Sequence, residues 1–140
     1  MSAKLTPYLA FGGKTKEAME FYKSVLGGDL KMQTYGEAQQ IKDESQKDLI
    51  MHASLENGEL SFMASDGNSE HPVHMGDNIS LSIAGDDETK LTEYFNKLAE
   101  GGKVTMPLEK QFWGDTFGML IDKFGIQWMI NVSGKKGEEK

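Results

Sequence analysis

The sequence predicts an α+β fold built from two consecutive modules, each with the element order βαβββ. Two segments have the apolar spacing of amphipathic helices, and each ends at a pair of glycines. A strand-like segment precedes each helix, and three strand-like segments follow it. The two halves match in type and are each about 60 residues long, which indicates an internal duplication.

In the first half, the apolar residues of 14–28 recur with helical spacing as far as Gly27-Gly28, which stops the helix. Asn57-Gly58 between two apolar runs indicates a tight hairpin turn. Residues 36–48 are a polar excursion, expected as a loop over a pocket or as a short helix. The elements expected are a strand at 5–11, a helix at 14–28, and strands at 30–35 and over 49–66.

In the second half, helical spacing continues as far as Gly101-Gly102, and Asp122 to Gly125 is expected to turn a hairpin. The elements expected are a strand at 78–85, a helix at 87–102, a strand within 103–113 and a hairpin over 116–131. We therefore expect one domain over residues 1–140, composed of module 1 at about 4–66, a linker at 67–76, module 2 at about 77–133 and a polar C-terminal tail.

Composition narrows the classes of partner. The net charge is -7, and all 15 cationic residues are Lys, so we expect no nucleic-acid partner and no multiply charged anion as the main ligand. The chain has no Cys, which excludes disulfides and thiolate metal sites. The first residues, MSAKLTPYLAF, lack the apolar run of a signal peptide, and no segment has the length of a membrane span, so we expect a cytoplasmic protein.

Two stretches carry a family resemblance. The opening PYLAFGGKTKEAMEFYKSVLGGDL and the closing FWGDTFGMLIDKFGIQWMIN resemble the PhnB-like branch of the vicinal oxygen chelate (glyoxalase/bleomycin resistance/dioxygenase) superfamily, and the likeness extends over roughly residues 5 to 132. This resemblance implies cupped, half-open mixed sheets with a central cavity, and a homodimer that is domain-swapped or not. Some members are labelled demethylubiquinone methyltransferase-like, but this sequence has no glycine-rich βαβ cofactor unit, so we give that label no weight.

The resemblance also implies where the metalloenzymes of the superfamily hold a divalent cation. The corresponding positions here are Pro7, Ser61 or Met63, Asn78 and Met129. A register slip of two residues would offer Glu59, Ser80, Gln127 or Asn131 instead. Either set contains at most one charged ligand, whereas divalent ions prefer several imidazole or carboxylate groups. We therefore expect no metal and no cofactor at these positions.

Histidines are the candidate acid–base groups. His52 lies in the middle of a predicted strand, and alternation places it on the face of Ser54, where it would act as a general base or hydrogen-bond partner. A half-buried structural histidine is the alternative. His71 and His74 would hold a metal only with a third ligand from the same loop, and a polar surface loop is the simpler interpretation.

The closing hairpin supplies most of the candidate ligand-binding residues. Alternation groups Phe117, Met119 and Ile121 with Ile126, Trp128 and Ile130 on one face, unless a bulge at Gly114 or Gly118 shifts the register by one. The opposite face would look into the cavity, where Met63 and Met129 make the floor apolar and adaptable. Trp113 and Asp115 either contact a planar ligand or cap and turn the sheet. The residues expected to bind the ligand are His52, Met63, Trp113, Asp115, Gln127, Met129 and Asn131.

Three functions are compatible with these residues. The first is a small-molecule binder with a largely apolar cavity and no metal catalysis. The alternative is a metal-dependent enzyme of the superfamily, of lyase, isomerase or dioxygenase type, using unrecognised ligands or His52 as acid–base group. The third is an interaction module whose dimer surface is its function. The sequence names neither the ligand nor a reaction.

Overall fold

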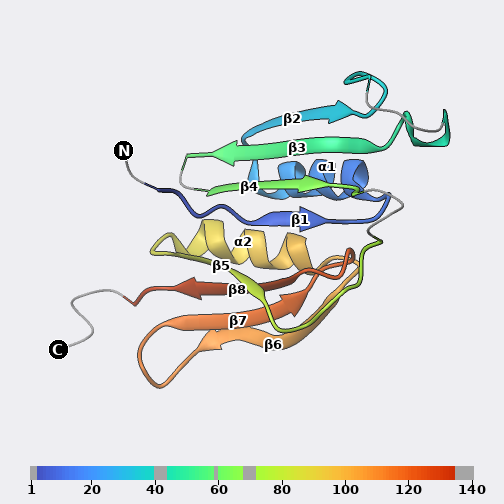
Figure 1. The fold of residues 1–140 in the computed structure, drawn as a ribbon. Coiled ribbons are helices and arrows are strands. Elements are labelled where there is room, and N and C mark those ends of the chain that lie inside the picture. The colour runs from blue at the N-terminus through green and yellow to red at the C-terminus, as the bar shows by residue number, and fades with distance from the viewer. Residues whose placement is uncertain (1–2, 40–43, 59, 68–71, 135–140) are drawn as a thin grey trace. The chain divides into compact units, whose positions relative to one another are not determined.

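The structure is a computed structural model that describes residues 3–39, 44–58, 60–67 and 72–134. The chain divides into two compact units, Met1–His74 and Met75–Lys140. The described residues of each unit form one α-helix and one four-stranded mixed sheet, with the main elements in the order βαβββ (Figure 1). The predicted α+β fold of two such modules is therefore confirmed.

The first unit has its sheet in the order β1-β4-β3-β2. The short β1 runs parallel to β4, and the other neighbouring strands are antiparallel. A 3-10 helix at Glu44–Gln46 lies within the predicted polar excursion, of which residues 40–43 are outside the described residues. The main elements are β1 (Tyr8–Ala10), α1 (Thr15–Leu26), β2 (Asp29–Thr34), β3 (Ile50–Asn57) and β4 (Leu60–Ser65).

The second unit repeats this topology, with its sheet in the order β5-β8-β7-β6. Here β5 runs parallel to β8, and β8, β7 and β6 are antiparallel neighbours. The elements are β5 (Ser80–Gly85), α2 (Glu88–Ala99), β6 (Lys103–Lys110), β7 (Thr116–Ile121) and β8 (Gln127–Val132). The first strand of each module is thus at one edge of its sheet, paired with the last strand of the same module.

The predicted glycine stops act through close backbone approach. Gly27 and Gly101 have φ of 73° and 76°, in the left-handed region that favours glycine. A Cβ on the next residue would lie 2.4 Å from the Glu56 carbonyl oxygen at Gly28 and 2.2 Å from that of Ile121 at Gly102. The second glycine of each pair therefore lets the chain leave its helix directly against the third strand of the module.

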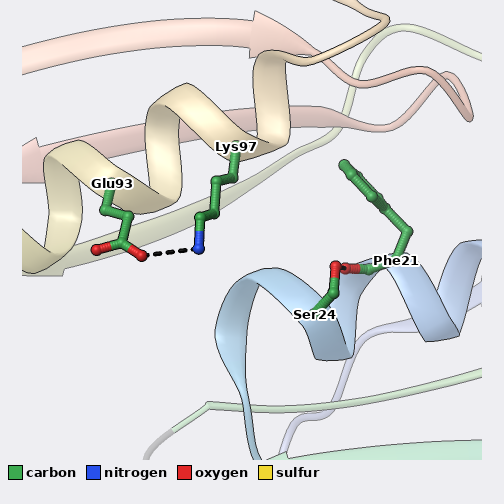
Figure 2. Close-up of polar contacts among 4 residues, drawn as sticks. All are labelled: Phe21, Ser24, Glu93 and Lys97. Carbon is green, nitrogen blue, oxygen red and sulfur yellow. Dashed lines mark hydrogen bonds and ion pairs between the residues drawn. The ribbon is translucent and has the colours of Figure 1, made fainter.

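Each helix covers one face of its own sheet with apolar side chains. In the first unit, Tyr22 of α1 is fully buried and its ring meets Phe62 edge-on at 5.6 Å between centroids. In the second, Phe95 of α2 lies so close to β7 that a Cβ at Gly118 would be 2.8 Å from its ring. The polar sides of both helices carry local contacts instead (Figure 2).

Those local contacts are of two kinds (Figure 2). On α2, Lys97 and Glu93 form an ion pair at 2.8 Å with the i,i+4 spacing that supports a helix. The hydrogen bond to Glu93 and its charge raise the pKa of Lys97. On α1, the Ser24 hydroxyl donates to the carbonyl of Phe21 at 2.6 Å, which satisfies the side chain within the helix.

Two buried aspartates organise the modules in different ways. Asp66, just after β4, accepts hydrogen bonds from the backbone N–H groups of Gly13 (2.8 Å), Thr15 (2.9 Å) and Ile50 (2.7 Å). Among the described residues, Lys14 at the start of α1 makes no side-chain cap, so the carboxylate of Asp66 takes that role from a distant strand. By contrast, α2 is capped locally by Asp87, which accepts from Lys90 N–H at 3.1 Å.

Asp122 organises the β7–β8 hairpin. Its carboxylate accepts from the backbone N–H groups of Phe124 (2.8 Å) and Ile126 (3.1 Å), and from the indole N–H of Trp128 (2.7 Å). Both the carboxylate and the indole are buried, and each satisfies the other. The predicted core position of Trp128 is therefore confirmed, together with the Asp122 to Gly125 turn, in which Gly125 N–H donates to the Asp122 carbonyl at 2.9 Å.

Candidate functional site

Each sheet has a helix-covered face and an opposite face, which we call the far face. The helix-covered faces carry the smallest exposed fractions: Ala53, Leu55, Phe62 and Ala64 in the first unit, and Gly118, Leu120, Trp128 and Ile130 in the second. Residues that alternate with these are half-buried or exposed. The far faces are therefore the surfaces on which side chains are positioned by strands yet remain open to contact.

A row of methionines crosses the far face of the second unit. Met106, Met119 and Met129 are successive cross-strand partners on β6, β7 and β8. Met106 is 40% exposed, and the other two are half-buried. Methionine is flexible and polarisable, so a row of three makes an apolar surface that adapts to the shape of what it touches.

The register of this hairpin corrects one prediction. Phe117, Met119 and Ile121 lie on the far face, where they pair with Asn131, Met129 and Gln127, and not on the helix-covered face. The reason is the turn: five residues separate the paired Ile121 and Gln127, so residues of like parity share a face. Gly118 takes the helix-covered position because Phe95 leaves no room for a side chain there. The predicted grouping of Gln127, Met129 and Asn131 on one face is confirmed.

Two exposed aromatic residues lie in the β6–β7 turn, close to this row. Trp113 is 50% exposed, and its ring is 4.9 Å from Phe112 and 6.2 Å from Phe117 between centroids. Gly114 has φ of 103°, a conformation that glycine adopts more readily than other residues, so its role is to form the turn. Through Phe117, Trp113 extends the apolar surface of the far face toward the hairpin tip. Its contact with a ligand remains a prediction.

Asp115 and Asn131 are joined to each other at the end of this sheet. Asn131 Nδ2 donates to one carboxylate oxygen at 3.0 Å, and Gly134 N–H donates to the other at 3.0 Å. The hydrogen bond from Asn131, with smaller contributions from Gly134 and the Trp113 indole, lowers the pKa of Asp115. This pairing favours a structural role, tying the chain after β8 to the β6–β7 turn, and any ligand contact by the two residues stays a prediction.

The far face of the first unit is more polar. Tyr8, Met63 and Ser54 are successive cross-strand partners on β1, β4 and β3, and His52 lies two residues before Ser54 on the same face. The Tyr8 hydroxyl is 3.0 Å from His52 Nδ1, at a solvent-accessible position. The structure thus brings together His52 and Met63, which the sequence predicts, with Tyr8, which it does not. Alternation within β1 could have assigned Tyr8 to a face, but the sequence does not indicate which strand β1 pairs with.

The positions that the resemblance implies for a metal are divided between the two units, and the absence of a metal there stays a prediction. Among residues 3–39, 44–58, 60–67 and 72–134, no group of three His, Cys, Asp or Glu side chains is arranged to hold an ion. Glu59 and His71 lie outside the described residues, so the loop pair of His71 and His74 is not described as a pair. In the same ranges, no helix has the length and apolar character needed to cross a membrane.

Comparisons with known proteins place this fold among relatives. The sequence profile of a family described as 3-demethylubiquinone-9 3-methyltransferase matches residues 3–131. Protein YjdN of Escherichia coli K12 is 31% identical over 140 residues, covering 91% of this chain and 94% of YjdN. Protein PA1353 of Pseudomonas aeruginosa has a crystal structure that is 40% identical, with a TM-score of 0.87, covering 96% of this chain and 100% of that one.

Two further solved structures are similar to this chain. A Bacillus cereus structure described as a putative 3-demethylubiquinone-9 3-methyltransferase, PhnB protein, is 28% identical with a TM-score of 0.76, covering 94% of this chain and 100% of that one. A glyoxalase/bleomycin resistance protein/dioxygenase family enzyme from Burkholderia phytofirmans shares the fold alone, at 13% identity and a TM-score of 0.59, covering 89% and 95% of the two chains. The first agrees with the predicted PhnB-like resemblance, and the second agrees with the predicted fold.

Proposed function

Because the chain belongs to the 3-demethylubiquinone-9 3-methyltransferase family of PhnB-like proteins, with the glyoxalase/bleomycin resistance/dioxygenase fold, we propose that it binds a small, largely apolar molecule on the far face of a module, without metal catalysis. The observation that carries this proposal is the methionine row of Met106, Met119 and Met129. Both units are βαβββ modules, and the described residues include no glycine-rich βαβ cofactor unit. Methyl transfer therefore forms no part of the proposal.

The second far face has the composition of a ligand surface. Its methionines are flanked by Phe117 and Ile121 on β7, and by Gln127 and Asn131 on β8. Ligand pockets in proteins are lined mostly by apolar and aromatic side chains, with a few polar groups that fix orientation. Since a purely structural sheet surface would be expected to expose polar groups, half-buried methionines opposite the helix favour contact with an apolar molecule.

Fluorescence tests this proposal directly, because both tryptophans belong to the second module. We expect the neutral probe N-phenyl-1-naphthylamine to bind saturably and to take up energy from Trp113. Met129→Gln should weaken binding by about fivefold, since it replaces an apolar contact by a polar one, while Met129→Leu should leave it within about twofold. Trp113→Phe should reduce the energy transfer. Absence of saturable binding for this probe and for other neutral aromatic compounds would refute the proposal.

The enzymatic alternative has one specific observation in its favour. The Tyr8 hydroxyl lies 3.0 Å from His52 Nδ1, and if the hydroxyl accepted a hydrogen from Nδ1, the lone pair of Nε2 would be free to act as a general base. Elemental analysis of protein purified without a metal-affinity tag separates the two functions. Near-stoichiometric zinc, nickel, manganese or iron would favour a metal-dependent reaction, and a metal-free protein that still binds the neutral probe would favour the binder.

We also propose a homodimer, by analogy with the family. The edge strand β6 supports this, because its apolar residues Val104 and Met106 are 43% and 40% exposed and a partner could cover them. Light scattering after size-exclusion chromatography gives the molar mass. A monomer at concentrations above those of the binding experiments would contradict this proposal and leave the binding proposal untouched.

A further inference from the structure

We propose that Tyr8 and His52 form a hydrogen-bond-donating subsite, on the far face of the first unit, for the uncharged carbonyl oxygen of a small molecule bound on that same face. The inference rests on the proposed function, because it names the polar group of a molecule whose apolar part would lie beside Met63 on this face. The observation behind it is the contact between the Tyr8 hydroxyl and His52 Nδ1 at 3.0 Å, across 44 residues of sequence.

The two residues of this pair come from strands that are separated by a third strand. Tyr8 is on β1 and His52 is on β3, and β4 lies between these strands. Met63 of β4 is the cross-strand partner of Tyr8, so an apolar side chain lies beside the pair. The two rings are 5.7 Å apart between centroids and inclined at 44°, and Tyr8 is 51% exposed. The polar atoms are thus accessible from the far face and adjoin an apolar surface.

The pair keeps one hydrogen to donate. A phenol and a neutral imidazole carry one polar hydrogen each, and their mutual hydrogen bond uses only one of them. The phenol is the more acidic partner, so we assign its hydrogen to the bond with Nδ1, which places the imidazole hydrogen on Nε2. In the described part of the chain, the side chains of His52 and Tyr8 have no other hydrogen bond, so this N–H remains available to an acceptor.

The charges on the same face favour an uncharged acceptor. Lys31 is the cross-strand partner of Ser54, but its ammonium is 3.9 Å from the Asp29 carboxylate. Glu56 pairs with Asp29 across the strands, so the described residues of β2 and β3 place two carboxylates and one ammonium on this face. No Arg occurs in the sequence. An anionic ligand would meet a net negative surroundings here, whereas a carbonyl oxygen needs only a donor.

A pair of matched probes tests the subsite. 2-Acetylnaphthalene and 2-isopropenylnaphthalene have the same planar shape, and only the first has a carbonyl oxygen. Equilibrium dialysis against the full chain should show the carbonyl probe binding about fivefold more tightly, the size expected for one net hydrogen bond. In Tyr8→Phe/His52→Leu this preference should fall to about one, while affinity for the hydrocarbon stays the same.

A control variant separates loss of the subsite from a general change in the first unit. Ser54→Ala changes a neighbouring polar residue on the same face and should keep the preference. Unchanged hydrocarbon affinity shows that the double variant is folded, and nitrogen NMR of His52 should report the Nε2–H tautomer in the wild type. Equal binding of both probes to the wild type, or a preference that survives the double variant, would overturn the subsite while leaving the proposed function intact. If neither probe binds, the proposed function fails and the subsite fails with it.

Discussion

The two modules are alike where their helices cover them and different on their far faces. On the covered side, Leu55 pairs with Phe62 in the first module and Leu120 pairs with Trp128 in the second, each an aliphatic residue beside an aromatic one. On the far side, the first module has Tyr8, His52 and Ser54, whereas the second module has a row of three methionines. The helix of each module therefore limits the choice of residues on the covered face, and the two modules differ on the face that their helices leave uncovered.

The largest expected effects come from the two buried carboxylates, which stabilise different parts of the two modules. Asp66 bonds the start of α1 in the first module, and Asp122 bonds the β7–β8 hairpin in the second. Asp66→Ala or Asp122→Ala leaves three donors without their acceptor, and we expect each to lower the free energy of unfolding by about 3 kcal/mol. Asp66→Asn and Asp122→Asn retain one acceptor oxygen and should cost less.

Urea unfolding followed by two signals separates the modules in this experiment. Tryptophan fluorescence reports only the second module, which holds both Trp113 and Trp128, whereas far-ultraviolet circular dichroism reports both. Asp122→Ala should shift the fluorescence midpoint. An Asp66→Ala variant that shifts the fluorescence midpoint as much would show that the modules unfold as one unit, contrary to separate roles for the two carboxylates.

The glycine stops should behave alike in the two modules. Gly28→Ala and Gly102→Ala would each drive a Cβ into a backbone carbonyl at 2.4 Å and 2.2 Å, and we expect a loss of about 2–3 kcal/mol in each case. Gly13→Ala is a matched control for Gly28→Ala, because the φ of Gly13 is 104° and that of Gly28 is 98°, yet a Cβ at Gly13 would meet no atom within 4 Å. Thermal unfolding measures the three variants. A loss at Gly13 equal to that at Gly28 would assign the Gly28 effect to backbone conformation alone.

A smaller loss of stability is expected from one residue that differs between the two helix-covered faces. Ala53 and Gly118 occupy corresponding positions, each two residues before the leucine of the Leu–aromatic pair. Gly118→Ala places a Cβ 2.8 Å from the Phe95 ring and from Leu108 Cα, so we expect a cost of about 2 kcal/mol. Gly118→Ala/Phe95→Leu should recover part of this loss, since the smaller side chain leaves room. Failure of that rescue would place the conflict at Leu108 instead.

The smallest effect concerns pH. Asn131 and Gly134 lower the pKa of Asp115 in the folded chain, so this carboxyl contributes stability above the pKa of the unfolded chain, and that stability is lost as pH falls through the folded value. The window lies below about pH 4. Asp115→Asn should make the second module slightly less stable at neutral pH and flatten its acid dependence, measured by fluorescence-detected unfolding. An unchanged acid limb would show that the pairing with Asn131 contributes nothing.

The sequence was sufficient for features that depend on neighbouring residues and insufficient for those that depend on register between strands. Helical spacing and paired glycines located α1 and α2, and Asn57-Gly58 located the first hairpin. The predicted sheet face of Phe117 was wrong, because that face depends on the number of residues in the turn between β7 and β8. Hydrogen bonds to Asp122 fix the conformation of this turn. Tyr8 and His52 could not be joined in advance, because their contact requires knowing that β4 lies between β1 and β3.

The cap supplied by Asp66 also has a consequence for the order of folding. Helix α1 begins at Thr15, but the carboxylate that satisfies its first N–H groups comes from a residue 51 positions later in the chain. During synthesis, α1 therefore leaves the ribosome as an uncapped and marginal helix until β4 has been made. The Asp122 carboxylate accepts from residues 124, 126 and 128, all within six positions of it, so we expect this hairpin to close as soon as it emerges. We expect the first module to acquire its structure late and all at once, and the closing hairpin of the second to form early.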